Sequence, residues 1–118
     1  MDKLYITEDL VYIHGSLRII NNCDGYYATY YDENESLQEV NVIEGIPLTP
    51  KILEKNGWRE EKGDYINDNY HIRLCEKIDG YSAYKVVNDA IVWLRDVESV
   101  SDLQHLFFGL NLNSEMEV

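Results

Sequence analysis

The sequence predicts an α+β fold, built from antiparallel strands and two short helices. Short apolar-polar alternations recur between turn-forming residues, as in β-strands. The segment "IPLTPKILEKNGW" (46–58) carries start and stop signals of a helix, and the pattern changes from strand to helical spacing after residue 98. A chain of 118 residues is close to one typical domain. We therefore expect a single domain, 1–118, with an N-terminal β subregion (1–45) followed by a helix, a meander and a C-terminal helix (46–118).

Four short antiparallel strands are predicted in the N-terminal subregion, at 9–14, 17–21, 26–31 and 37–43. Gly15-Ser16 separates the first two, and the turn-rich "DENES" separates the last two. We expect a small curled sheet or partial barrel with one buried face and with acidic residues on the other face. The expected inward-facing residues, besides alternate tyrosines, are Leu10, Tyr12, Leu17, Ile19, Leu37, Val40 and Val42.

A short helix is predicted over about 50–56. Thr49 is a suitable N-cap, and Gly57 is a suitable C-terminal residue. Leu48 and Leu53 have the spacing of a hydrophobic staple. We interpret this helix as a connector that orients the two strand regions.

An antiparallel meander is predicted from Trp58 to about residue 97. Its strand patterns are "YIND", "YHIRLCEKI", "YSAYKVV" and "AIVWLRDV". Asp79-Gly80 has the composition of a tight type I′ turn, and Asn88-Asp89 is a weaker version of it.

A C-terminal amphipathic helix is predicted over about 100–110. Ser99 is followed three residues later by Asp102, which resembles a capping box. We expect the helix to pack on the meander through its apolar positions, and we assign these to the core: Val100, Leu103, Leu106, Phe107 and Leu110.

Charge is the most unusual feature of the composition. Ten Lys and Arg against 22 Asp and Glu give a net charge of −12, which argues against binding nucleic acid or anionic membranes directly. No Lys or Arg occurs between Arg18 and Lys51, so residues 24–44, which we name the acidic window, form a predicted cation-free face. Its acids are Asp24, Asp32, Glu33, Glu35, Glu39 and Glu44. Such a face is either a solubilising surface or a docking surface for a basic partner.

Tyrosines are also concentrated in the acidic window. Four of the ten tyrosines are Tyr26, Tyr27, Tyr30 and Tyr31. On one strand they would place two rings on each face, so at least two are expected to be accessible. Tyrosine is common in strands, but it is also enriched in protein interfaces. The window's six acids and four tyrosines are therefore our candidate partner-binding residues.

No motif for catalysis, metal binding or cofactor binding stands out. His14, His71 and His105 lie in separate predicted elements, and "DENESLQEVNVI" lacks the glycine and final glutamate of a calcium loop. Phosphate-binding glycine motifs and the nucleophile elbow are missing from the sequence. We expect no enzyme activity, no catalytic residues, no metal and no cofactor. The chain carries no export signal or span-length apolar run, so we expect a cytoplasmic protein with Cys23 and Cys75 reduced.

Two segments carry a family resemblance. The positions are Ile46, Pro47, Leu48, Thr49, Leu53, Gly57 and Trp58, then Val100, Leu103, Gln104, Leu106, Phe107 and Leu110. In this pattern the chain resembles a set of small proteins carried by phages, prophages and conjugative elements of Bacteroides-type gut bacteria. The opening strand, "DLVYIHGSLRI", keeps only part of that set's pattern. The resemblance implies a phage or mobile-element setting and transfers no active site.

Three functional hypotheses follow. The first is a non-enzymatic accessory protein that binds a host or anti-phage defence protein with a basic surface, for instance as its inhibitor. The second is an acidic DNA mimic that occupies a nucleic-acid-binding groove. The third is a small-ligand-binding protein.

Overall fold

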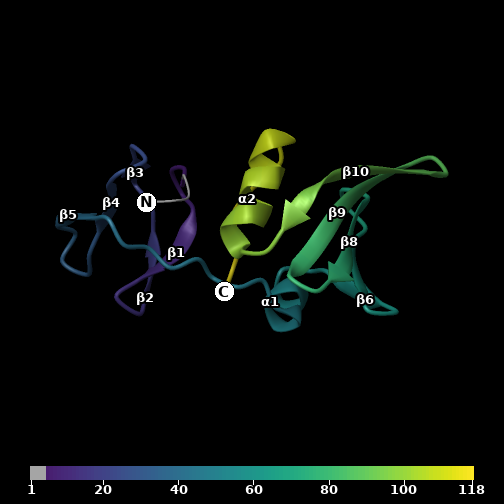
Figure 1. The fold of residues 1–118 in the computed structure, drawn as a ribbon, viewed down its shortest axis with the longest axis horizontal. Coiled ribbons are helices and arrows are strands. Elements are labelled where there is room, and N and C mark those ends of the chain that lie inside the picture. The colour runs from purple at the N-terminus through teal and green to yellow at the C-terminus, as the bar shows by residue number, and fades with distance from the viewer. Residues whose placement is uncertain (1–4) are drawn as a thin grey trace.

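The computed structural model describes residues 5–118, which contain three antiparallel sheets and two helices (Figure 1). The predicted α+β class is confirmed, and within these residues no sheet closes into a barrel. The molecule is elongated, with extents of 49 × 25 × 24 Å. The N-terminal sheets lie at one end, and the meander lies at the other (Figure 1).

The N-terminal strands form a two-stranded and a three-stranded sheet. β1 (Leu10–Ile13) pairs with β2 (Ser16–Ile19), and β4 (Ala28–Tyr31) lies between β3 (Asn22–Cys23) and β5 (Leu37–Val40). Four of these strands fall where the alternation predicts them. The two-residue β3 is additional.

The predicted inward face of these strands is wrong for several residues: Leu17, Ile19, Leu37 and Val42 are exposed. The reason is that β1 is buried on both faces. Leu10 joins the larger core, whereas Val11 and Ile13 join a smaller core with Ile20, Ala28 and Val40. β2 and β5 lie outside β1 and β4, so one face of each remains open to solvent.

The connector helix α1 (Pro50–Lys55) forms as its caps predict. The Thr49 side chain accepts a hydrogen bond from the Ile52 N–H at 3.3 Å. Gly57 has a φ of +84°, a conformation that glycine adopts without steric cost. Leu48 and Leu53 are both buried, as expected for a hydrophobic staple.

The meander is a five-stranded sheet of order β10-β9-β8-β7-β6. Its strands are β6 (Arg59–Glu61), β7 (Asp64–Asn67), β8 (Ile72–Lys77), β9 (Gly80–Val87) and β10 (Ala90–Val97). The Asn88-Asp89 turn lies where it is predicted, between the paired residues Val87 and Ala90.

The other predicted turn is displaced by one residue. Lys77 pairs with Gly80, so the turn residues are Ile78 and Asp79, and Gly80 begins β9. Only Gly80 of these three has a positive φ, +97°, which is not a type I′ turn. A Cβ added to Gly80 would lie 2.5 Å from the Val97 carbonyl oxygen, so close packing also requires glycine here.

Helix α2 (Val100–Gly109) lies between the two ends of the molecule and contacts both β1 and β10 (Figure 1). Ser99 and Asp102 form the predicted capping box. Four of the five predicted apolar positions are buried in the larger core, but Leu110 is exposed because the helix ends at Gly109. Neither described helix has the length and apolar character needed to cross a membrane.

Candidate protein-binding surface

The first two tyrosines of the acidic window project from a turn. Asp24 accepts hydrogen bonds at Oδ1 from the N–H groups of Tyr26 (2.9 Å) and Tyr27 (2.8 Å). Because this carboxylate binds their amides, β4 begins only at Ala28, and the prediction that all four tyrosines share one strand is wrong. The two rings are left 76% and 48% exposed. The same amide hydrogen bonds, Tyr27 first, lower the pKa of Asp24 below its ordinary 3.8.

Tyr30 and Tyr31 lie on opposite faces of β4. Tyr30 packs against the smaller core, with the Arg18 guanidinium 5.5 Å from its ring centroid. Tyr31 is paired with Leu37 on the outward face and is 56% exposed. Three rings are thus accessible, which confirms the expectation of at least two.

Asp32 uses its carboxylate to shape the loop between β4 and β5. Its Oδ1 accepts the N–H groups of Asn34 (2.9 Å) and Ser36 (3.0 Å), and its Oδ2 accepts Gln38 Nε2 (2.9 Å). These contacts, the Ser36 amide first, lower the pKa of Asp32. Asp24 and Asp32 are therefore structural groups as well as surface charges.

The prediction of a cation-free face is wrong, because folding brings Arg18 of β2 to Glu33. Their ion pair lowers the pKa of Glu33, with the side-chain hydrogen bond as the main cause. The acids Glu35, Glu39 and Glu44 are exposed, and their carboxylates make no ion pair with any residue of 5–118. These three supply the window's uncompensated charge.

The outer edge of β2 lies beside Tyr31. Leu17, Ile19 and Tyr31 help to line a surface hollow of about 480 Å³. Tyr12 of β1 exchanges both of its backbone hydrogen bonds with Glu44, so by alternation the N–H and C=O groups of Leu17 and Ile19 point away from β1. The edge thus offers two exposed apolar side chains and backbone groups that no strand within residues 5–118 pairs with.

The alternation predicts Leu17, Ile19 and Leu37 in the core, and the structure has them on the surface. In β2, Leu17 and Ile19 alternate with the polar residues Ser16 and Arg18, so the pattern predicts that the two apolar side chains face inward, whereas in the structure they face solvent. Arg18 was missed for a related reason, since its contact with Glu33 depends on how β2 lies against β4.

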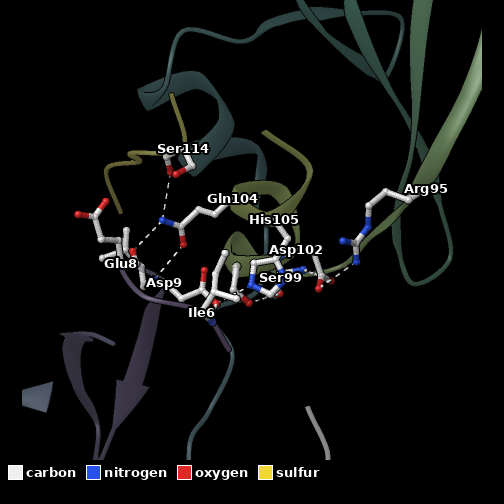
Figure 2. A network of polar contacts seen from close by, with 11 residues as sticks. Ile6, Glu8, Asp9, Arg95, Ser99, Asp102, Gln104, His105 and Ser114 are labelled. Carbon is white, nitrogen blue, oxygen red and sulfur yellow. Dashed lines mark hydrogen bonds and ion pairs between the residues drawn. The ribbon is translucent and has the colours of Figure 1, made fainter. Parts of the chain in front are cut away.

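A second polar cluster joins α2 to the segment before β1 (Figure 2). Gln104 Oε1 accepts the Leu10 N–H at 2.9 Å, and Gln104 Nε2 donates to the carbonyls of Glu8 (3.2 Å) and Ser114 (3.1 Å). His105 Nε2 lies 2.5 Å from Oδ2 of Asp9, which is 1% exposed.

The serines of the cluster in Figure 2 also make structural contacts. Ser99 caps α2 by accepting the Asp102 N–H, and the Ser99 and Ser101 hydroxyls lie 3.1 Å apart. Each side chain of the cluster thus has a structural partner, and we assign the cluster to the joint between the two ends of the molecule.

No group of three or more His, Cys, Asp or Glu side chains within residues 5–118 could hold a metal ion. Comparison of the chain with protein-family models, curated proteins and solved structures finds no match.

Proposed function

We propose that this protein acts by binding another protein through a surface formed by the acidic window and the outer edge of β2. The observation that carries the proposal is the exposure of three tyrosine rings, Tyr26, Tyr27 and Tyr31, beside uncompensated carboxylates. Tyrosine provides a large contact area at low entropic cost and is frequent among residues that dominate binding energy.

Charge supplies the long-range part of recognition. Glu35, Glu39 and Glu44 add to a net charge of −12, so the partner surface that fits best is basic. Because exposed charges are screened within about 10 Å at 0.1 M salt, they act mainly on the rate of encounter.

Apolar contact supplies the short-range part. Tyr31 and Leu37 form an outward-facing cross-strand pair, and Leu17 and Ile19 extend the apolar surface along β2. A partner segment in extended conformation could also pair with the open backbone of β2.

The phage or mobile-element setting suggests that the partner is a host or anti-phage defence protein, which binding would inhibit. The support for this setting is the resemblance of the sequence to small proteins of phages, prophages and conjugative elements. A non-enzymatic, cytoplasmic role is part of the same proposal.

DNA mimicry has less support. A mimic needs rows of carboxylates in place of phosphates, whereas Asp24 and Asp32 are bonded to backbone amides and Glu33 is paired with Arg18. Exposed aromatic rings interrupt the acidic surface as well. A small-ligand site in the β2 hollow is also less well supported, because its cation, Arg18, already has a partner.

The proposal is tested by affinity capture from a Bacteroides-type lysate with tagged wild type and two double variants, followed by quantitative mass spectrometry. The first variant, Leu17→Ser with Tyr31→Ala, alters the proposed surface. The control, Ile78→Ser with Phe108→Ala, alters an aliphatic and aromatic pair outside it that is even more exposed.

We expect at least one protein to be retained by the wild type and the control and lost with the surface variant. Equal retention by all three chains, in variants whose melting curves show them to be folded, would place the binding surface elsewhere. Retention of nothing would contradict the protein-binding proposal itself.

A further inference from the structure

Strand β10 is an edge of the five-stranded sheet, and its edge is apolar. Ile91, Val92 and Trp93 are each more than half exposed, and no charged residue occurs from Ala90 to Leu94. The opposite edge, β6, consists of Arg59, Glu60 and Glu61. Edge strands usually carry charges that prevent pairing with another chain, so the same sheet has one protected edge and one unprotected edge.

The backbone of β10 is also arranged for pairing. The Val86 N–H donates to the His71 carbonyl on the β8 side, so Lys85 directs its backbone groups toward its partner Val92. By alternation, the N–H and C=O groups of Ile91 and Trp93 point to the open edge.

We propose that β10 is a self-association surface, where a second copy of this chain pairs antiparallel about a two-fold axis at Val92. In this register Ile91 of each copy faces Trp93 of the other. Both residues have outward backbone groups, so each such pair exchanges two hydrogen bonds and the sheet becomes continuous across the dimer.

The side chains fit the same register. Ile91 and Trp93 lie on one face of β10, so each Trp93 packs against Ile91 of the second copy, an aromatic and β-branched pair that stabilises sheets.

The net charge of −12 opposes association of two copies, but the charge lies mostly away from β10. The β9–β10 hairpin reaches the end of the molecule farthest from β3, β4 and β5 (Figure 1). The molecule is 49 Å long, and screening acts over about 8 Å at physiological salt. The dimer thus keeps its two acidic windows at its far ends, where each can bind a partner.

The test is the mass in solution, measured by sedimentation over a concentration series, with Val92→Lys as the disrupting variant. This change places two lysines side by side on the two-fold axis, which repel each other. Leu37→Lys is the matched control, because it also replaces an exposed aliphatic residue of an edge strand, β5, by lysine. We expect a dimer for wild type and Leu37→Lys, and a folded monomer for Val92→Lys.

Tryptophan fluorescence gives a second readout. Trp58 is buried within one chain, whereas Trp93 is 58% exposed, so dilution of the dimer is expected to increase quenching of Trp93 by a soluble quencher. Val92→Lys is expected to show this greater quenching at every concentration.

A wild type that is monomeric throughout the series, with β10 left open to a different chain, overturns the proposal. A dimer that survives Val92→Lys overturns it too.

Discussion

Replacement of Phe107 by alanine tests how the core holds α2 to the meander. Phe107 is 6% exposed, stacks with Trp58 at a centroid distance of 6.1 Å and meets Tyr70 edge-on at 5.6 Å. Removing a buried phenyl ring from such a site costs about 3–5 kcal/mol, from lost burial and the cavity left behind. That is a large part of the roughly 5–15 kcal/mol by which a typical domain is stable.

The expected shift in melting temperature follows from chain length. The entropy of unfolding of a chain of this size is about 0.25 kcal/mol/K, so Phe107→Ala is expected to lower Tm by about 12–20 °C. The measurement is thermal unfolding by circular dichroism or calorimetry.

Phe108 provides the matched control for this measurement. It is the next residue of the same helix and is 67% exposed, so Phe108→Ala is expected to change stability by less than about 0.5 kcal/mol. A Phe107→Ala protein that melts with the wild type, or no lower than Phe108→Ala, would refute the assignment of Phe107 to the core.

Three further predictions concern local structure. Gly80→Ala is expected to destabilise the fold by more than about 2 kcal/mol in chemical denaturation, because residue 80 has a positive φ and its new Cβ would clash with the backbone. Gly109→Ala is the control and is expected to be neutral or stabilising, because a Cβ at residue 109 has no atom within 4 Å. Ser99→Ala removes the N-cap of α2 and is expected to cost about 1–2 kcal/mol, whereas an unchanged midpoint would show that the cap contributes nothing. Asp32 has a lowered pKa, so the stability from its charge is present above pH 3.8 and is lost as pH falls through the folded value. The Tm deficit of Asp32→Asn is therefore expected near neutral pH and to vanish well below pH 3.8; a pH-independent deficit would contradict this.

The helices could be predicted from the sequence because their signals are local. Thr49 and Ser99 cap helices through residues three positions away, and Gly57 ends α1 through its own backbone conformation. Most strand positions could be predicted as well, since alternation and turn residues are also short-range properties.

The faces of the N-terminal strands could not be predicted in the same way. β1 is buried on both sides by elements distant in sequence, including α2, and this leaves Leu17 and Ile19 on the surface. A pattern within one strand does not contain that information. The turn at Ile78-Asp79 was misplaced by one residue because Gly80 is needed after the turn, where it lies against the Val97 carbonyl.

The composition of the candidate surface could be predicted from the sequence, but the contacts of its individual residues could not. The concentration of acids and tyrosines marked the window, but the structure divides its members by role. Asp24 and Asp32 hold turns, Tyr30 packs inward under Arg18, and Tyr31 joins the apolar edge of β2. The roles of Tyr30 and Tyr31 depend on contacts between segments, whereas the carboxylates of Asp24 and Asp32 bind amides two to four residues away.

The kinetics of binding to a captured partner test the central claim most directly. Two triple variants each remove three negative charges from the net −12: Glu35, Glu39 and Glu44 to Gln in the window, and Glu54, Glu76 and Glu117 to Gln outside it. We expect the window triple to slow association more than its charge-matched control at low salt. The difference is expected to shrink as the screening length falls from about 10 Å at 0.1 M to about 3 Å at 1 M. Equal association rates for the two triples at every salt concentration would show that the acidic window is a solubilising face and would contradict the proposed function.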